Sequence, residues 1–327
     1  MRLLTGLTIG LALAATPALA VQSLETLAST PGAPLLIEGV ARDGSGALIL
    51  SSVHEGRLMR VAADGALTAF GPAGRQAMFG LVADPARGAL WVASSPTDHD
   101  DQEDRTAELL QINAVTGEVL AAYAADGLDH AFGDVAMGPD GAVFIGDTKA
   151  AQVLVLRPGG TALEVLADLP ERGSPQGMVV SPDGRWLVFS DYGTGLHRLE
   201  IGGGRYERRD FTADTFIPLP GPEGVELRGI DGMVRRGDRI IAIQNGTRTQ
   251  RVLSLALDAD WSAVTVREPL IEGAPLSEPT TGFIEDDSLV FVSRSQWTDF
   301  GPDGQPTSPT PAPAVISRLS LSPEPRS

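Results

Sequence analysis

Short apolar runs separated by turn residues recur along the chain. Six segments share one order: an apolar run, a turn rich in Asp, Gly and Pro, and a second, strongly β-prone run. They are EGVARDGSGALILSS (38–52), FGLVADPARGALWVASS (79–95), GDVAMGPDGAVFIGD (133–147), QGMVVSPDGRWLVFSD (176–191), DGMVRRGDRIIAIQNG (231–246) and TGFIEDDSLVFVSRS (281–295). Turn residues between two short apolar runs predict a β-hairpin, so the sequence predicts a hairpin in each copy.

A third run with strand character follows every hairpin, and a fourth follows in most copies, including YERRDFTA (206–213) in the fourth copy. The copies begin 41 to 55 residues apart. Four antiparallel strands at such a period are typical of one β-propeller blade. The sixth copy lacks its own fourth run, whereas residues 22–28 resemble a fourth strand. The pattern predicts an all-β, six-bladed β-propeller of four-stranded antiparallel blades, in which residues 22–28 complete the last blade and remove its open edge.

Residues 1–20 have the pattern of a secretory signal peptide: an early positive charge, an apolar stretch and a small-x-small cleavage site that ends at Ala20. A membrane anchor is the rival interpretation, but the apolar run is short for a bilayer and is broken near Pro17. We therefore expect cleavage after Ala20 and a periplasmic or secreted location. One propeller domain would then cover residues 21–320, followed by a tail over 321–327.

The composition narrows the range of partners. The chain has no cysteine and a formal net charge of −17 at pH 7. The lack of cysteine excludes disulfides, cysteine metal sites and cysteine nucleophiles. Strong acidity disfavours nucleic acid and anionic membranes, because both require a basic surface. The expected partner is a small-molecule substrate or ligand, and any site lined with carboxylates would favour cations.

One position at the start of each innermost strand carries the candidate chemistry. If that strand starts at the upper face of the ring, this position lines the upper mouth of the central channel. Two carboxylates beside an amide are costly to bury without a counter-charge, and Ca²⁺ prefers oxygens of these types. A divalent cation at this mouth is one interpretation, and hydrogen bonding to water or backbone is the other. Across the six copies the position reads Glu38, Phe79, Gly133 (followed by Asp134), Gln176, Asp231 and Thr281.

Loops after the second strands share the upper face with these residues. They supply Tyr192, Asn245 and Trp297 as candidate substrate-binding residues. Trp297 and Phe300 begin a proline-rich loop (295–313), where they either cap a ligand or pack the loop onto its own blade.

Other polar residues of the same face have open roles. The acidic loop 97–106 is either a solvated surface loop, a lid over the channel or a weak second cation site. His54, His99 and His130 lie in upper loops and are candidates for acid–base chemistry. His197 lies in a third strand and is expected to point outward. The histidine spacing does not match a zinc site.

The register of Glu38 in IEGV, Gln176 in PQGM and Asp231 in IDGM resembles the regucalcin/gluconolactonase family of six-bladed propellers. In that family a Glu, an Asn in a P-N-G-L/M context and an Asp in a P-D-G-M context hold one divalent metal. The resemblance implies hydrolysis of a sugar lactone or related ester, with calcium as the expected cation at these three residues. Two departures are visible. Gln176 replaces the Asn, and AFGDV keeps only Asp134 of the family's Arg-x-Asn-Asp-Gly run.

Under this interpretation the cation polarises the substrate carbonyl. Asp231 or Asp134 takes the proton from an attacking water, and Phe79 forms an apolar wall. Two other functions stay open. The two departures from the family favour a non-catalytic propeller that binds a small ligand or a protein. A quinone-cofactor sugar dehydrogenase is disfavoured, because a basic and histidine-rich channel lining is not evident in the sequence.

Overall fold

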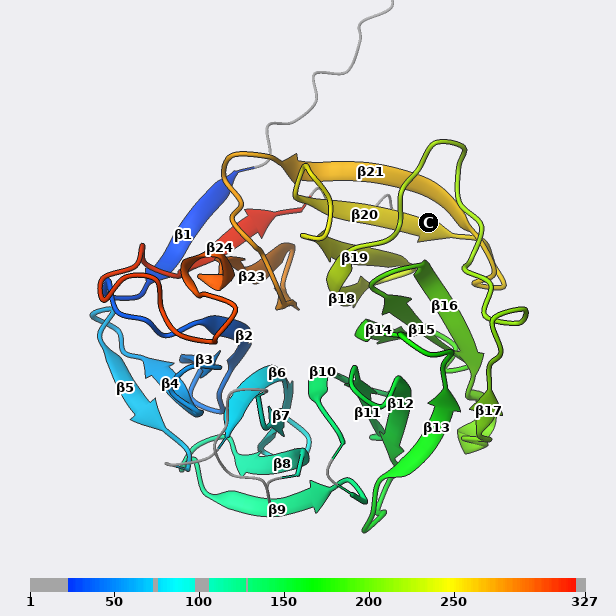
Figure 1. Cartoon of the computed structure of the whole chain (residues 1–327), viewed down its shortest axis with the longest axis horizontal. Coiled ribbons are helices and arrows are strands. Elements are labelled where there is room, and N and C mark those ends of the chain that lie inside the picture. Colours follow the sequence, from blue (N-terminus) through cyan, green and yellow to red (C-terminus); the bar gives the residue numbers. More distant parts are fainter. Residues whose placement is uncertain (1–22, 73–75, 98–105, 128, 322–327) are drawn as a thin grey trace, which may run out of the picture.

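The computed structural model of the chain describes residues 23–72, 76–97, 106–127 and 129–321. These residues form six sheets around a central axis (Figure 1), which confirms the prediction of an all-β, six-bladed propeller. The expected signal peptide, His99 with most of the acidic loop, and residues 322–327 of the tail lie outside the described residues. Within the described ranges, no helix is long and apolar enough to cross a membrane.

Each blade is built from consecutive strands, with the innermost strand first. Blade one consists of β2 (Ile37–Arg42), β3 (Leu48–Ser52), β4 (Arg57–Val61) and β5 (Leu67–Phe70). Blade two consists of β6 (Ala77–Asp84), β7 (Ala89–Ser95), β8 (Glu108–Asn113) and β9 (Val119–Ala124). Blade three begins with β10 (Phe132–Met137), β11 (Val143–Asp147), β12 (Gln152–Leu156) and β13 (Glu164–Asp168).

The second half of the ring follows the same order. Blade four consists of β14 (Pro175–Val180), β15 (Trp186–Asp191) and β16 (Gly195–Glu200). Blade five consists of β18 (Ile230–Arg236), β19 (Arg239–Gln244), β20 (Arg251–Leu257) and β21 (Val264–Glu272). Blade six contains β22 (Gly282–Glu285), β23 (Ser288–Arg294) and β24 (Val315–Ser320). Short 3₁₀ helices lie at η1 (Gly202–Gly204) and η2 (Trp297–Asp299).

The N-terminal strand β1 (Leu24–Ser29) is the outer strand of blade six. It pairs antiparallel with β24, with Leu24 opposite Leu319 and Ser29 opposite Val315. The predicted closure of the ring by an N-terminal strand is therefore confirmed.

Blade four departs from the four-strand prediction, because its sheet contains three strands within the described residues. Of the expected fourth strand (206–213), only β17 (Arg209–Asp210) is extended, and it pairs in parallel with β13 of blade three. The chain between β16 and β18 contains η1 and prolines at 218, 220 and 222. Glycine weakens a strand and proline removes a ladder donor, so this segment cannot run as a regular outer strand.

The segment nevertheless covers blade four. Phe216 stacks on His197 with ring centroids 3.7 Å apart, and the amide of Leu219 donates to the carbonyl of Leu196 at 2.6 Å. His197 is 2% exposed. The expectation that His197 points outward is wrong, because the segment that replaces the fourth strand lies over it.

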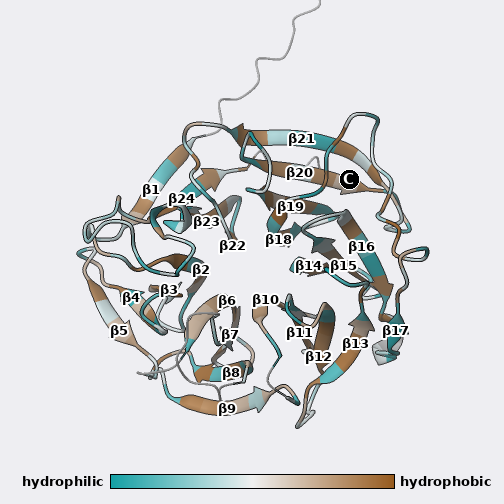
Figure 2. Cartoon of the chain, viewed as in Figure 1, coloured by the Kyte–Doolittle hydropathy of each residue, from teal (hydrophilic) through white to brown (hydrophobic). Residues whose placement is uncertain are grey.

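Apolar side chains of neighbouring sheets fill the space between the blades. Ile49 of blade one, for example, packs in one cluster with Leu90 and Val92 of blade two. Figure 2 shows how hydropathy changes across blade five: β20 is mostly hydrophobic, and the outer strand β21 has hydrophilic stretches. Because the strands alternate in direction, the turns between first and second strands share one face, called lower here. The loops after second strands and the links between blades share the other, upper face.

Candidate functional site

A cavity of about 340 Å³ lies at the upper mouth of the channel. Residues near the upper ends of the innermost strands line it, together with residues from the upper loops and from one link between blades. Its lining consists of Glu38, Phe79, Gly133, Thr148, Gln176, Tyr192, Asp231, Asn245, Glu278 and Trp297. The structure thus brings together seven of the eight residues predicted to be catalytic, to bind substrate or to hold a metal: Glu38, Phe79, Gln176, Tyr192, Asp231, Asn245 and Trp297.

Glu38, at the start of β2, is held by the first residue of η2. The indole Nε1 of Trp297 donates to Glu38 Oε2 at 2.6 Å. Trp297 follows Gln296, which has a left-handed backbone (φ 88°) and is 1% exposed. The amide of Gln296 accepts from the backbone N–H groups of Leu35 and Leu36 and donates to two further backbone carbonyls. A non-glycine residue in that conformation is costly, and these hydrogen bonds offset the cost and fix Trp297 over the cavity.

The two aromatic residues that begin the same loop lie in different surroundings. Trp297 is 39% exposed at the cavity mouth. Phe300 instead lies against His54, with ring centroids 5.2 Å apart. One aromatic residue therefore faces the cavity, and the other packs the loop onto blade one instead of onto its own blade, blade six.

A chain of hydrogen bonds orders the opposite wall. Asn245 Nδ2 donates to Asp231 Oδ2 at 2.7 Å and to the carbonyl of Pro279 at 3.0 Å. The hydroxyl of Tyr192 donates to Asn245 Oδ1 at 2.9 Å. Asp231 is thus oriented by Asn245, and Asn245 in turn by Tyr192.

Gln176 presents an oxygen to the cavity. Its Nε2 donates to the hydroxyl of Ser174 at 3.2 Å. Its Oε1 lies on the side of Gly133, where a Cβ atom would be 3.7 Å from that oxygen. Gln176 and Gly133 both line the cavity.

The sequence reasoning missed Glu278, which lies in the link between β21 and β22. Its backbone has φ 49°. Its amide donates to Gln250 Oε1 at 2.8 Å, and Gln250 Nε2 donates back to Glu278 Oε1 at 2.5 Å. Because links between blades differ in length, Glu278 has no equivalent in the other copies that a repeat comparison could have revealed.

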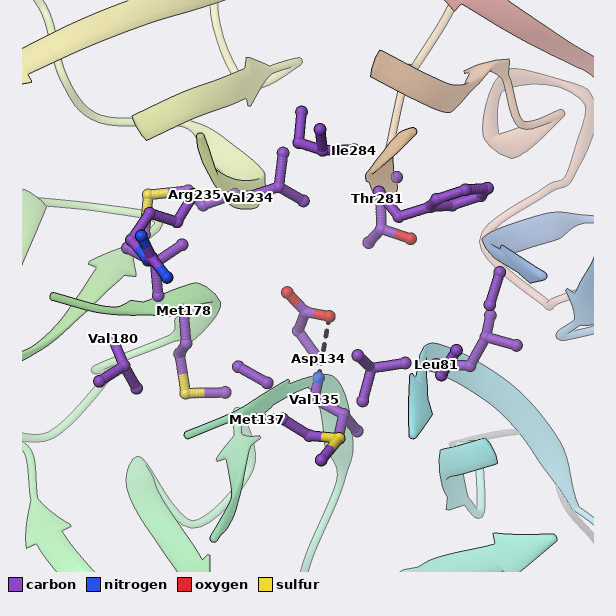
Figure 3. Close-up of a pocket in the computed structure, with 18 of the residues that line it drawn as sticks. Leu81, Asp134, Val135, Met137, Met178, Val180, Val234, Arg235, Thr281 and Ile284 are labelled. Carbon is purple, nitrogen blue, oxygen red and sulfur yellow. Dashed lines mark hydrogen bonds between the residues drawn. The ribbon is translucent and has the colours of Figure 1, made fainter. Parts of the chain in front are cut away.

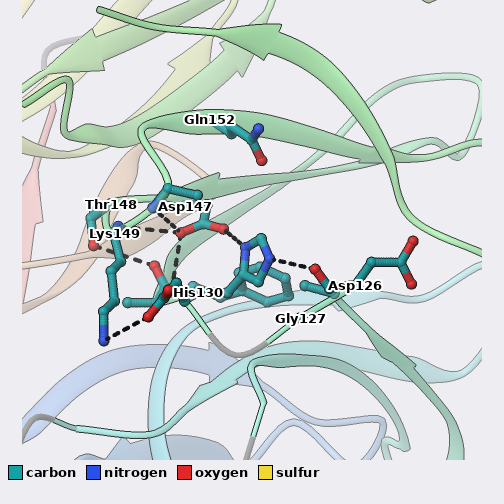
Figure 4. A network of polar contacts seen from close by, with 12 residues as sticks. Asp126, Gly127, His130, Asp147, Thr148, Lys149 and Gln152 are labelled. Carbon is teal, nitrogen blue, oxygen red and sulfur yellow. Dashed lines mark hydrogen bonds and ion pairs between the residues drawn. The ribbon is translucent and has the colours of Figure 1, made fainter. Parts of the chain in front are cut away.

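Thr148 was also missed, although the repeat contains a signal for it. Buried Asp147 closes β11 and accepts from the backbone amides of Ala131 (3.0 Å) and Ala150 (3.0 Å) and from His130 (Figure 4). The residue after this aspartate, Thr148, then faces the cavity.

Blade four has the same arrangement, with a buried aspartate at the end of its second strand. Buried Asp191 closes β15 and accepts from the amides of Ser174 (2.6 Å) and Thr194 (2.9 Å), and the next residue is Tyr192. In blade five, Gln244 is fully buried and precedes Asn245. A buried polar residue at the end of a second strand therefore positions the residue that follows it.

His130 does not line the cavity. Its Nδ1 bonds Asp147 Oδ2 at 2.5 Å and its Nε2 bonds the carbonyl of Asp126 at 3.0 Å (Figure 4). Burial opposes the charged form, but the bond to Asp147 raises the pKa of His130 overall. Both ring nitrogens are engaged, so His130 shapes the loop that positions Thr148.

The carboxylates of the cavity disfavour one another's ionisation. Burial raises the pKa of Glu38 well above its usual range, and the charge of Asp231 adds to this rise. Burial likewise raises the pKa of Asp231 to about 7, with Glu278 reinforcing the effect and the Asn245 hydrogen bond opposing it. Burial, followed by the same three carboxylates, raises the pKa of Tyr192 to about 12. None of the described residues that line the cavity is Lys, Arg or His.

The structure places two residues expected at the upper mouth, Asp134 and Thr281, in a second cavity below. Asp134 is the one of them predicted to be catalytic. It takes the place that glycine has in the other five copies: Gly39, Gly80, Gly177, Gly232 and Gly282. Successive strand residues point to opposite sides, so a shift of one position turns Asp134 away from the upper cavity. Its charge still raises the pKa of Glu38.

The side chains that line the cavity include oxygen atoms that could coordinate a metal ion. No three His, Cys, Asp or Glu side chains in the described part of the chain form a metal-binding cluster. The expected ligand set has two carboxylates and one amide, Glu38, Asp231 and Gln176, all of which line one cavity. Their oxygen chemistry fits a hard divalent cation, with water completing the six to eight ligands that Ca²⁺ takes.

The fold and the cavity define a class: a six-bladed propeller with an acidic, aromatic-rimmed cavity at one mouth of its channel. No protein-family model matches the sequence, and no curated protein matches it. Solved structures do resemble it. They include a gluconolactonase from Xanthomonas campestris (18% identity, TM-score 0.60, covering 92% of this chain and 90% of that one) and a calcium-binding regucalcin from Agrobacterium tumefaciens (19%, 0.55, 92% and 97%).

A PQQ-bound aldose sugar dehydrogenase from Streptomyces coelicolor is similar to the same degree (15% identity, TM-score 0.60, covering 91% of this chain and 98% of that one). At these identities the likeness defines the fold. The similar structures include gluconolactonase and regucalcin propellers, so the resemblance noted from Glu38, Gln176 and Asp231 holds at the level of the fold.

Proposed function

We propose that the chain is a divalent-cation-dependent hydrolase of a lactone or ester, acting in the upper cavity and exported to the periplasm or the exterior. One observation carries the proposal. Glu38 and Asp231 line one cavity with the amide oxygen of Gln176, their pKa values are raised, and no described lining residue supplies a positive charge. The fold similarity to a gluconolactonase and to a calcium-binding regucalcin supports the same function.

Glu38, Gln176 and Asp231 would hold the cation, most favourably Ca²⁺ because all three offer oxygen. When bound, such an ion polarises a carbonyl as a Lewis acid. Trp297 fixes Glu38 through Oε2, which leaves Oε1 for the cavity. Asn245 fixes Asp231 in the same way through Oδ2.

We assign to Asp231 the role of general base, which accepts the proton of an attacking water. Without a cation, burial raises the pKa of Asp231 to about 7, and a bound cation would favour the ionised form that a general base requires. Tyr192 and Asn245 orient it and offer hydrogen-bonding groups to the substrate, and Phe79 supplies an apolar wall. Asp134 acts on the site through its charge, from the neighbouring cavity.

A quinone cofactor such as PQQ does not fit the upper cavity. PQQ carries carboxylates, so its site needs basic side chains. The described lining residues include three carboxylates, Glu38, Asp231 and Glu278, and no Lys, Arg or His. We therefore derive no redox step for this cavity.

The test begins with the purified mature chain. Bound divalent metal is measured, and thermal stability is compared before and after chelation. We expect bound metal, a lower Tm after chelation that Ca²⁺ restores, and hydrolysis of at least one member of a lactone and aryl-ester panel. Glu38→Ala and Asp231→Ala should abolish metal binding and turnover. Asp64→Asn, an exposed residue of a lower turn, is the matched control and should change neither. No metal, no Tm shift and unaltered behaviour of both alanine variants would refute the hydrolase.

A ligand-binding function without catalysis is the second candidate, and Gly133 favours it. That residue contributes no side chain to the cavity wall, so a bound sugar would meet fewer polar partners in blade three. Metal binding without turnover across the panel, together with a ligand-induced Tm increase that Glu38→Ala abolishes, would support this function over the hydrolase.

A further inference from the structure

A second, larger cavity of about 520 Å³ occupies the lower part of the channel. Residues of β2, β6, β10, β14, β18 and β22 line it, so every blade contributes a wall (Figure 3). Its lining extends to Pro85 and Pro139 in the turns after the innermost strands, which places its mouth on the lower face. The upper and lower cavities therefore have different lining residues and open at opposite faces.

The wall of the lower cavity is predominantly apolar. Its side chains include Leu81, Val135, Met178, Val180 and Val234 (Figure 3). Methionine is flexible and polarisable, so Met178 can adapt to ligands of different shape. A cavity of this size and polarity is typical of a small-molecule site.

One acidic side chain interrupts this apolar wall. Asp134 is 9% exposed and projects from β10 into the cavity (Figure 3). Its Oδ1 accepts from the amide of Val135 at 2.8 Å. Its Oδ2 makes no hydrogen bond or ion pair with any described residue and faces the cavity. A carboxylate at a largely buried position is unfavourable for folding unless a partner or water meets its charge, and the other five blades have glycine at this place.

The distribution of charge indicates the kind of ligand. Asp134 is the acidic group within this cavity, and Glu38 and Asp231 interact with it from the upper side, where a cation held by them would offset their charge. At the mouth, Arg42 is engaged by Glu285, and exposed Arg235 donates to the carbonyl of Gly237. The inner end therefore has a negative charge with no counter-charge among the described residues.

We propose that the lower cavity binds an organic ammonium ion with an apolar body. Its N–H group donates to Asp134 Oδ2, and its hydrocarbon part packs against Leu81, Met178 and Val234. The apolar wall excludes small hydrated cations, because they would lose water without gaining enough oxygen ligands. Charge and shape together select an amine over an alcohol of the same size.

The probe is n-hexylammonium, with n-hexanol as its neutral counterpart, and binding is measured by calorimetry at pH 8 with the purified mature chain. Wild-type protein should bind n-hexylammonium, and n-hexanol on the order of tenfold more weakly or worse, because a charge-assisted hydrogen bond to a buried carboxylate is lost. Asp134→Asn should weaken n-hexylammonium binding to a similar degree and leave n-hexanol binding unchanged.

Two further variants locate the ligand. Val234→Trp fills the lower cavity and should abolish binding of both probes. Glu278→Gln removes charge from the upper cavity only and should leave binding intact. Circular dichroism confirms that each variant is folded. The proposal is overturned if wild-type protein does not bind n-hexylammonium, if n-hexanol binds equally well, or if Asp134→Asn or Val234→Trp binds n-hexylammonium as wild type does. Loss of binding in Glu278→Gln, but not in Val234→Trp, would place the amine in the upper cavity and refute the lower site.

Discussion

Replacing Asp231 with asparagine should stabilise the metal-free protein at alkaline pH. Burial raises the pKa of Asp231 from its ordinary 3.8 to about 7 in the folded chain. A difference of this size corresponds to ~4 kcal/mol between the protonated and ionised forms, which is an upper estimate because other carboxyl groups share the interaction. Asparagine has nearly the same shape and can still bond Asn245, so Asp231→Asn removes mainly the charge.

The sign of the pH dependence follows from the same values. The unfolded chain ionises Asp231 near its ordinary pKa, whereas the folded chain resists ionisation until about pH 7. The loss of folding free energy caused by ionising Asp231 is therefore absent below about pH 4, grows as the pH rises to about 7, and is complete above that. Asp231→Asn should accordingly gain stability at pH 8 and gain little at pH 4.

Urea unfolding in the presence of a chelator, at several pH values from 4 to 8, measures this difference. The expected gain at pH 8 is between ~1 and ~4 kcal/mol, and Asp64→Asn controls for the loss of one surface charge. Added Ca²⁺ should reverse the order of stability, because the wild-type carboxylate then gains a partner. A variant that is less stable than wild type at pH 8 without metal, or a gain independent of pH, would refute the electrostatic account of the cavity.

Three further outcomes are expected. Trp297→Phe removes the hydrogen bond that lowers the pKa of Glu38, so that pKa should rise further, and the acidic limb of any pH–rate profile should move to higher pH. Gly80→Ala would place a Cβ atom 2.9 Å from Asp134 Cα and 2.9 Å from the carbonyl oxygen of Gly133, so the free energy of unfolding should fall by ~1–3 kcal/mol in urea titrations. N-terminal sequencing of the exported protein should begin at Val21, and retention of residues 1–20 on the mature chain would contradict the proposed signal peptide.

The repeat made most of the ring predictable. Turn residues such as those after Val180 in blade four separate runs that can only be strands, and strand alternation fixes which residues face the channel. Glu38, Gln176 and Asp231 could be aligned because each precedes a glycine, and the structure explains that glycine: at Gly177, for example, a Cβ atom would lie 2.5 Å from the amide nitrogen of Met233. The close approach of neighbouring innermost strands enforces the register.

What the sequence could not predict lies where the repeat breaks. Glu278 comes from a link whose path depends on the lengths of its neighbours, so no alignment of copies locates it. Asp134 was grouped with the upper residues because a shift of one position in a short strand leaves little trace in sequence. The outer segment 206–213 occupies the place of a fourth strand in the repeat, but its neighbours include three glycines and three prolines, and packing of Phe216 onto His197 replaces pairing.

The pairing of β1 with β24 also has a mechanical consequence. Because the two strands are antiparallel, Leu24 and Leu319 lie together at one end of the pair, and Ser29 and Val315 at the other. Tension applied through the two chain termini would therefore break the hydrogen bonds between β1 and β24 one after another, beginning at Leu24 and Leu319, instead of all at once. The joint that closes the propeller would unzip at low force, although the same hydrogen bonds loaded in shear would resist together.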